Sequence, residues 1–378
     1  MNILYKTILS VFVMTMPLLG AELPEALQVH ANESVVRGLD WLLTQQNEKG
    51  YFGIPDAPAI TGLCVIAMSY SDEMRESPAF NRAVDWIIST ARPDGGFYVM
   101  PSQTRRGGGR ATYNTGICMM ALHLSGRPDA RPYVLAARKF VAAGQRAEQD
   151  SSSYGGFGYD LMGMSDYADM SNTYVAVQAM ALTEEAEDLR EGEQVDFNKE
   201  AAAEFISHMQ HAPQSNPGSW VMTDDENRGG FTYHVPENNR ELGTKEKVKL
   251  SAYGSMTYAG IMSLLYCDVD RSDPRIRSAF DWASRHWTVD ENPGVGTQGY
   301  FYFLNILSKC MATIQDDVLI AQDGTVIPWR EEMIQKLVDL QLEDGTWKNE
   351  DNRYWEGNPI LVTAYTLTAL EILLSDGE

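Results

Sequence analysis

The sequence predicts an all-α fold: six helix-turn-helix repeats that close into an α6-α6 barrel (an α/α toroid), with one small β-hairpin. Three observations predict it. An amphipathic helix leads six times into a short glycine-aromatic turn, each turn leads into a nearly uncharged helix, and the turns lie roughly 60 residues apart, a regularity typical of stacked repeats. The turns occupy residues 50–53, 94–97, 155–158, 229–231, 299–301 and 344–347.

The two helices of each repeat differ in where their apolar residues fall. The first helix is apolar on one face only: in the second repeat Phe80, Val84 and Ile87 recur at helical spacing, so that face is buried and the other lies in water. The second helix has almost no charge, and a helix that is apolar all round must be surrounded by protein. We therefore expect the first helices outside and the second helices inside, in a single domain over residues 30–378. The nearly uncharged stretches are 116–124, 174–182, 258–266, 302–314 and 360–374.

Capping and turn residues mark the ends of several elements. Asn358-Pro359 places a capping residue before a proline, which is a typical helix start. Asp323-Gly324 lies between two apolar pairs, and this dipeptide favours the tight turn of a hairpin. We expect the acidic stretch 184–200 to be a surface insertion.

The beginning of the chain has the pattern of a targeting segment. Lys6 is the only charge among residues 1–21, and the apolar run 8–19 is too short to span a bilayer, which takes about 20 residues. We expect a secretory signal peptide over residues 1–21 and an exported protein, periplasmic or secreted, with no transmembrane segment after signal removal. The alternative is an N-terminal anchor that stays attached.

The charge of the chain excludes one class of partner. The formal net charge is −22, whereas nucleic acid binding requires a basic footprint on the protein surface. We therefore expect no nucleic acid partner, and the acidic surface is explained by solubility.

The four cysteines fall in matching positions of different repeats. Cys64 and Cys118 occupy the same register of consecutive repeats, and Cys267 and Cys310 lie near the ends of the fourth and fifth uncharged helices. Two interpretations stay open: disulfides between neighbouring helices, which export would permit, or buried free thiols.

The turns resemble those of a known family. The best copy, at residues 340–347, is Leu-Gln-Leu-Glu-Asp-Gly-Thr-Trp. It resembles the repeat of squalene–hopene cyclases and protein prenyltransferase β-subunits, and the resemblance covers residues 33–376. Segments 169–173, 253–260 and 359–365 are similar to a group of exported bacterial proteins that carry this repeat. The resemblance implies an α/α toroid with an apolar, isoprenoid-like molecule as its partner in a central cavity, although one scaffold hosts many chemistries.

The toroid also indicates which end to search for a site. Its inner helices run parallel, so six helix N-termini with partial positive charge open onto one end of the barrel. Asp166 and Asp169 lie just before the third inner helix, where squalene–hopene cyclases carry the acid motif Asp-x-Asp-Asp. Here the middle acid is missing. Asp166 and Asp169 are candidate catalytic acids, and the alternative is that Asp169 caps the helix. His234 is a candidate acid or base at the mouth, or a structural residue.

The second repeat supplies candidate binding residues. Arginines around the glycine run 107–109 would suit a diphosphate or carboxylate, and the alternative is a mobile loop. Tyrosines at the starts of inner helices would form the cavity wall. The predicted substrate-binding residues are Arg105, Arg106, Arg110, Tyr113, Asn114, Tyr174, Tyr258 and Tyr302.

No metal or cofactor is expected. Protein prenyltransferases hold a zinc ion on inner helices of late repeats with an Asp, a Cys and a His, but the corresponding stretch 249–260 contains neither Asp nor Cys. His208 and His211 have a metal-ligand spacing, and we interpret them as a surface pair.

Three functions therefore stay open. The chain binds an apolar, isoprenoid-like molecule, either with or without transforming it in the manner of a terpene cyclase; or it is a carbohydrate-active lyase or hydrolase on the same toroid; or it is a non-catalytic binding or interaction protein whose centre is filled. A long apolar cavity at the glycine-turn end would favour the first, and a broad cleft lined by acids and aromatic rings would favour the second.

Overall fold

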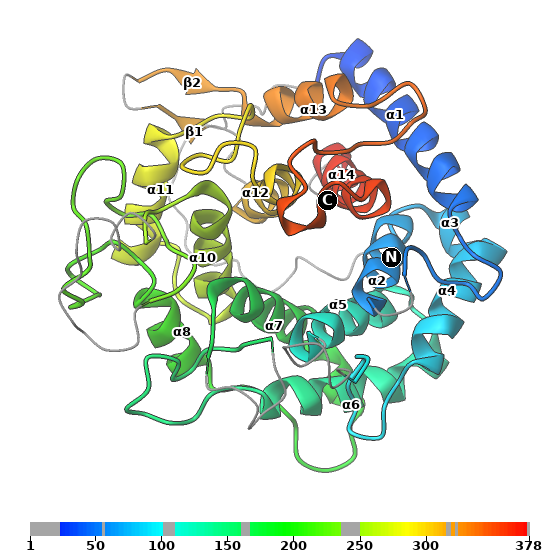
Figure 1. Ribbon diagram of the computed structural model, residues 1–378, viewed down its shortest axis with the longest axis horizontal. Helices are drawn as coiled ribbons and strands as arrows, with labels where there is room; N and C mark the ends of the chain where they lie inside the picture. The colour runs from blue at the N-terminus through cyan, green and yellow to red at the C-terminus, as the bar shows by residue number, and fades with distance from the viewer. Residues whose placement is uncertain are drawn as a thin grey trace, which may run out of the picture.

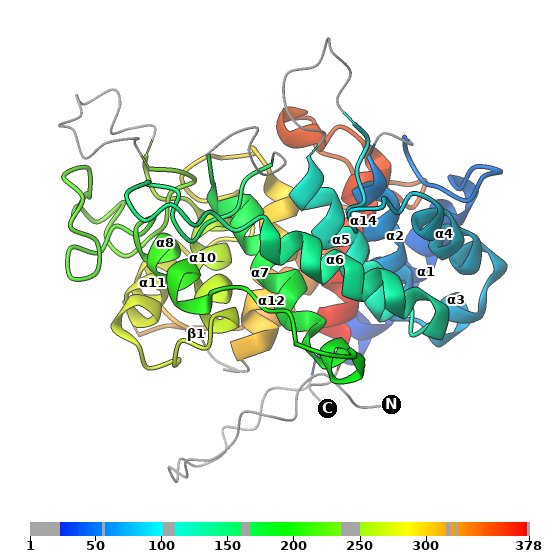
Figure 2. The ribbon, with the colours of Figure 1, turned by 90° about the horizontal axis from the view of Figure 1, so that it is seen from below.

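The predicted α/α toroid is confirmed by the computed structural model, which describes residues 23–54, 57–100, 110–159, 167–235, 250–314, 319–321 and 324–375. Two concentric rings of helices surround a common axis (Figure 1), and Figure 2 shows the rings edge-on. The inner ring is formed by α2 (Pro58–Met68), α5 (Ala111–Leu124), α7 (Met170–Leu182), α10 (Gly254–Tyr266), α12 (Tyr300–Ile314) and α14 (Pro359–Leu374). Each inner helix contacts the next, and α14 contacts α2. The ring is therefore closed.

The outer ring covers the inner one with amphipathic helices, as predicted. Its members are α1 (Glu25–Thr44), α4 (Pro78–Ser89), α6 (Arg131–Ala143), α8 (Lys199–Ser207), α11 (Pro274–Arg285) and α13 (Trp329–Asp339). The short helix α3 (Asp72–Glu76) and three 3-10 segments join them, namely η1 (Pro128–Ala130), η2 (Glu184–Leu189) and η3 (Arg353–Trp355). The predicted hairpin is also present, because β1 (Leu319–Ile320) pairs antiparallel with β2 (Val326–Ile327).

In five of the six turns the first glycine allows the turn to touch the next outer helix. Gly155 has a φ of 81°, and a Cβ atom added there would lie 1.9 Å from the carbonyl oxygen of Ala201 in α8. Gly50, Gly95, Gly229 and Gly345 share the positive φ and the approach to a backbone carbonyl of the following outer helix. Because only glycine combines this conformation with this space, the turn glycines fix each repeat against its neighbour.

A glutamine at the end of four outer helices strengthens this contact. The side-chain amide of Gln145 donates, through Nε2, to the carbonyl oxygen of Gly155 in its own turn and to that of Asn198 at the start of the next outer helix, at 2.9 Å each. Gln46, Gln210 and Gln341 make the equivalent pairs. The bond from Gln341 to Ser34 joins the last repeat to the first.

The aromatic residue of each turn ties it to the following inner helix. The backbone N–H of Phe157 donates to the hydroxyl of Thr173 at 3.0 Å, and its ring is fully buried. The same bond joins Phe52 to Thr61, Phe97 to Thr115, Phe231 to Thr257 and Trp347 to Thr363. In the degenerate fifth repeat no such threonine is used, and the carboxylate of Glu356 accepts from the N–H groups of Phe301 and Tyr302 instead.

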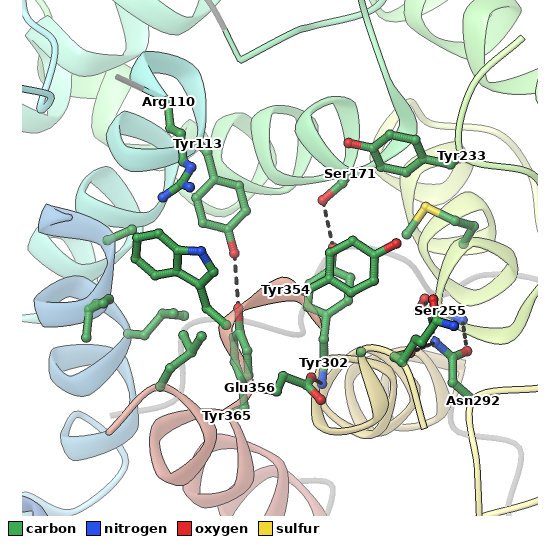
Figure 3. Close-up of a pocket in the computed structure, with 18 of the residues that line it drawn as sticks. Arg110, Tyr113, Ser171, Tyr233, Ser255, Asn292, Tyr302, Tyr354, Glu356 and Tyr365 are labelled. Carbon is green, nitrogen blue, oxygen red and sulfur yellow. Dashed lines mark hydrogen bonds between the residues drawn. The ribbon is translucent and has the colours of Figure 1, made fainter. Parts of the chain in front are cut away.

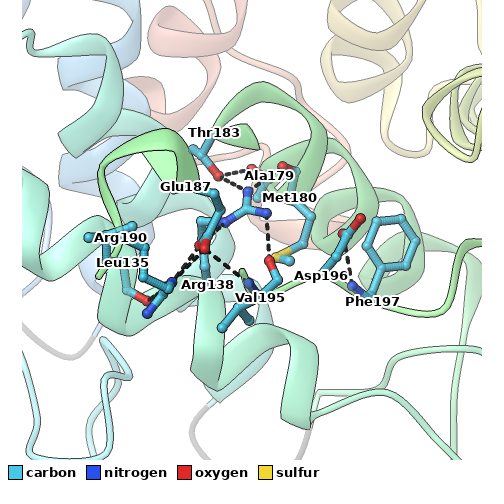
Figure 4. Close-up of polar contacts among 10 residues, drawn as sticks. All are labelled: Leu135, Arg138, Ala179, Met180, Thr183, Glu187, Arg190, Val195, Asp196 and Phe197. Atoms are coloured by element: carbon cyan, nitrogen blue, oxygen red, sulfur yellow. Dashed lines mark hydrogen bonds and ion pairs between the residues drawn. The ribbon is translucent and has the colours of Figure 1, made fainter. Parts of the chain in front are cut away.

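The acidic stretch after α7 is more than a surface insertion, contrary to our prediction. Glu187 is only 4% exposed and accepts hydrogen bonds from Arg138 of α6, from Arg190 and from the N–H of Val195 (Figure 4). Burial raises the pKa of Glu187, but these donors outweigh it and lower the pKa to about 2. Arg138 also donates to Thr183. This cluster holds η2 against α6 and α7.

Other predictions can be placed on the structure as well. Cys64, Cys118, Cys267 and Cys310 are all free and buried, so the free-thiol interpretation describes this structure. No helix in the described ranges is long and apolar enough to cross a lipid bilayer. The predicted signal peptide, residues 1–21, lies outside the described residues.

The glycine contact can be tested with alanine. Gly155→Ala should destabilise the protein by about 3–4 kcal/mol, because it adds a clash with Ala201 to the cost of a positive φ. Gly192→Ala is the matched control: it has a φ of 99° but nothing within 4 Å of the added Cβ, so it should cost only about 1 kcal/mol. Urea unfolding measures both. Equal losses would contradict the proposed role of the contact.

Candidate functional site

A cavity of about 350 Å³ opens at the glycine-turn end of the toroid, as the parallel inner helices predicted. Its volume lies within the range of small-molecule sites. Each of the six inner helices contributes a residue from its first turns, so all six begin at this end. These residues include Ile60, Tyr113, Ser171, Met256, Tyr302 and Leu361.

The wall is mostly apolar and is rich in tyrosine. Seven tyrosines line it, from inner helices and from the loops between repeats. Their rings supply apolar surface and their hydroxyls supply single polar points, so the wall suits a ligand with a large apolar body. The seven are Tyr113, Tyr159, Tyr233, Tyr253, Tyr302, Tyr354 and Tyr365.

Two pairs of hydroxyls cross the lumen between helices that are not neighbours in the ring (Figure 3). Tyr113 of α5 lies 3.2 Å from Tyr365 of α14, oxygen to oxygen, and Ser171 of α7 lies 3.2 Å from Tyr302 of α12. In each pair one inner helix stands between the two partners. The pairs bridge next-but-one helices of the ring, so part of the centre of the toroid is filled by its own side chains.

One described carboxylate, Glu356, lines the cavity. It is fully buried, and it accepts hydrogen bonds from Asn349 at 2.7 Å and from the N–H groups of Phe301 and Tyr302 at the start of α12. Burial raises the pKa of Glu356 although these donors oppose the rise. Its charge is balanced by the positive end of the helix.

Asp169 lies behind the wall rather than in it. It caps α7, since its carboxylate accepts from the N–H of Asn172 at 2.9 Å, and it is fully buried. Burial raises the pKa of Asp169 to about 6, against hydrogen bonds from Asn172 and Tyr233 that lower it. Tyr233 is in turn hydrogen-bonded to Tyr159. A carboxylate only accepts, so Tyr233 donates to Asp169 when that acid is ionised. The two tyrosines connect the buried acid to the cavity.

Arg110 stands at the mouth. It precedes α5 in a left-handed conformation (φ 56°), and its guanidinium lies 4.3 Å from the ring centroid of Trp355, in a cation–π contact. Among the described residues no carboxylate lies within ion-pair distance of Arg110. Both Arg110 and Trp355 line the cavity.

The cavity contains some of the predicted residues and lacks others. Arg110, Tyr113, Asn114 and Tyr302 line it. Tyr174 and Tyr258 are buried in the helix packing and do not. The reason is helical phase. Tyr113 and Tyr302 are third residues of their helices, whereas Tyr174 and Tyr258 are fifth residues, which turns their side chains about 200° around the helix.

The remaining predicted residues lie elsewhere. His234 packs against the rings of Tyr167 and Tyr233 outside the cavity lining, and burial lowers its pKa. Asp166, Arg105 and Arg106 fall outside the described residues.

The histidine pair was wrongly interpreted as a surface feature. His211 is fully buried, its Nε2 hydrogen-bonds to the carbonyl oxygen of Leu250, and its Nδ1 accepts from the N–H of Met222. Both ring nitrogens are therefore used within the fold. Within the described ranges no group of three or more His, Cys, Asp or Glu could hold a metal ion.

Sequence reasoning missed most of the loop residues of the wall. The connections between the helices have no repeating sequence pattern that predicts the direction of a side chain. Three residues of the wall lie in such connections: Tyr159, Tyr233 and Trp355. Tyr365 could have been predicted. It lies one turn after Leu361, the third residue of α14, and on the same face of that helix.

The comparisons with known proteins bear on the fold. No family model and no curated protein sequence matches the chain. A protein from Actinoplanes matches its structure with a TM-score of 0.54 at 14% identity, over 91% of this chain and 100% of that one. A variant of the type II terpene cyclase MstE from Scytonema, in complex with its substrate geranylgeranyl dihydroxybenzoate, matches with a TM-score of 0.54 at 13% identity, over 92% and 98%. An alpha-1,6-mannanase of Salegentibacter matches with a TM-score of 0.54 at 10% identity, over 91% and 100%.

At these identities the matches show the fold alone. The chain has a terpene cyclase-like α/α toroid fold, which it shares with glycosidases. The expected resemblance in fold is thereby confirmed. The chemistry of the site has to be argued from its own residues.

The position of Asp169 predicts a pH effect on stability. Its pKa in the folded protein is above its unfolded value, so its contribution to stability is present below about pH 4 and is lost as the pH rises to about 6. Asp169→Asn keeps the cap and removes this loss. The variant should therefore gain about 2–3 kcal/mol relative to the wild type between pH 4 and pH 7, measured by urea unfolding.

A matched control is the exposed Asp270, whose pKa is lowered by hydrogen bonds from Ser272. Asp270→Asn should show no such gain over the same pH range. A difference between Asp169→Asn and the wild type that stays constant with pH would contradict the buried-acid assignment.

Proposed function

We propose that this chain binds a small, predominantly apolar, isoprenoid-like molecule in the cavity at the glycine-turn end of the toroid. The observation that carries the proposal is the wall itself: a site lined by residues of all six inner helices, with aliphatic side chains, tyrosine rings and few charges. Such a wall gains free energy by removing apolar ligand surface from water.

The hydrogen-bonded path from Asp169 supports the further proposal that the bound molecule is transformed by acid chemistry. Asp169 can store a proton near pH 6, and Tyr233 and Tyr159 connect it to the cavity. In this proposal Asp169 acts through the tyrosines and does not touch the ligand.

The structural neighbours support two different readings of the same toroid. The terpene cyclase MstE is in complex with geranylgeranyl dihydroxybenzoate, and the alpha-1,6-mannanase is in complex with alpha-1,6-mannotriose. Glycoside hydrolysis uses two carboxylates on either side of the bond that breaks. Within the described lining Glu356 is the one carboxylate, and it already accepts a hydrogen bond from the N–H of Tyr302 at the start of α12. This observation favours the apolar ligand over the sugar.

The proposal is tested by the ligand that accompanies the natively purified protein. Organic extraction and mass spectrometry of the wild type should yield an apolar molecule at about one per chain, and Ile60→Trp, which fills the cavity, should lower its amount at least tenfold. Ile54→Trp is the matched control, because Ile54 is 45% exposed and lies outside the lining, and it should leave the amount unchanged.

Three outcomes separate the alternatives. Binding of oligosaccharides without any apolar ligand would establish the carbohydrate reading. An empty wild-type protein that also fails to bind added isoprenoids would overturn the proposal and favour the non-catalytic protein with a filled centre. An apolar ligand equally abundant in Ile60→Trp would place the binding site elsewhere.

We also propose that the chain is exported by cleavage of a signal peptide at residues 1–21. The support is the charge and apolar run at its start. Mass spectrometry of the mature protein from its native host should find a new N-terminus close to residue 22, in the periplasmic or secreted fraction. A full-length chain in the cytoplasmic fraction would contradict export.

A further inference from the structure

We propose that Arg110 binds a carboxylate group of the ligand, so that the ligand is an amphipathic monocarboxylic acid whose apolar body fills the tyrosine-lined cavity. This inference rests on the proposed function and names the chemical class of its ligand. Four observations carry it: the state of the Arg110 side chain, the balance of charges in the wall, the strained loop opposite Arg110, and the number of cationic groups.

The guanidinium of Arg110 is held in place but has no ion pair with a described carboxylate. One face lies on the Trp355 ring, at 4.3 Å from the centroid, and no described carboxylate lies within ion-pair distance. A stacked guanidinium still presents its N–H groups along the edge, in the fork geometry that matches a carboxylate. Arg110 is thus oriented for an anion that the described part of the chain does not provide.

The other charge of the described wall does not compete for Arg110. Glu356 is satisfied by Asn349 and by the N–H groups that begin α12. The six helix N-termini around the mouth add partial positive charge. Although the whole chain is strongly acidic, the mouth of the cavity is locally suited to an anion.

The loop opposite Arg110 is held in a strained conformation. Tyr354 and Trp355 both have positive φ values, 64° and 69°, which cost of order 1–2 kcal/mol each for residues with side chains. Side-chain hydrogen bonds from the surrounding loop hold them there: the N–H of Arg353 donates to Asp351, and the N–H of Gly357 donates to Asn352. The strain keeps two aromatic rings at the rim, and Trp355 positions Arg110.

The number of cations defines the head group. One guanidinium faces the mouth among the described residues, and a single guanidinium neutralises one negative charge. A carboxylate carries one charge and takes two parallel N–H bonds from arginine. A phosphate monoester shares the oxygen acceptors but brings a second charge, so it should gain less from Arg110 alone.

The test compares three probes with the same tail: farnesoic acid, farnesol and farnesyl phosphate, titrated calorimetrically into the purified protein at low salt. The wild type should bind farnesoic acid at least tenfold more tightly than farnesol. Arg110→Leu should abolish this difference and leave farnesol binding unchanged, and Arg110→Lys should retain only part of it, because it keeps the charge but loses the fork and the stack.

Arg353→Leu is the matched control. Arg353 lies in the same loop and stacks on Tyr354, at 5.4 Å, but it does not line the cavity, so its removal should leave all three affinities unchanged. Circular dichroism checks that each variant is folded. Equal binding of the acid and the alcohol by the wild type would overturn the carboxylate inference while leaving the proposed function intact.

The other outcomes are equally decisive. Farnesyl phosphate as the tightest ligand, with its advantage lost in Arg110→Leu, would replace the carboxylate by a phosphate. Equal weakening of all three probes in Arg110→Leu would show that Arg110 only shapes the mouth. No binding of any probe by the wild type would overturn the proposed function itself.

Discussion

The approach of each glycine turn to the next outer helix is the contact on which the rest of the toroid depends. A side chain at Gly155 would meet the backbone of α8, and one at Gly345 would meet the backbone of α1. The glutamines add hydrogen bonds between the same backbones. Because the glycine contacts and the acceptors of the glutamine bonds are main-chain groups, these contacts do not depend on the side chains of the next outer helix. The last of them, at Gly345, closes the ring.

The same turns determine where a site can form. In five of the six turns the aromatic N–H bonds to a threonine at the start of the next inner helix, so the helix begins at a set distance from its turn. These helices therefore begin at one level around one mouth. The fifth repeat departs from this rule, because Glu356 replaces the threonine hydroxyl. The departure lies in the cavity wall, which is where a local rule is expected to yield to function.

The fold could be predicted from the sequence because its determinants are periodic, whereas the site is mostly not. Turn glycines, buried aromatics and uncharged helices recur in every repeat, and together they define the ring. The third residues of the inner helices, such as Tyr113 and Tyr302, could be predicted to face the lumen. Tyr159, Tyr233 and Trp355 come from connections that occur once each. The positive φ at Trp355 depends on a loop whose hydrogen bonds have no sequence period.

This division between ring and loops has a consequence for specificity. The hydroxyl pairs Tyr113–Tyr365 and Ser171–Tyr302 join inner helices within the wall of the cavity. Arg110 and Trp355, which precede or connect the inner helices, line the same cavity. Substitutions in these connections change the lining without touching the glycine contacts that hold the ring. Under the proposed function, the connections are therefore where the ligand is specified, at little cost in folding stability.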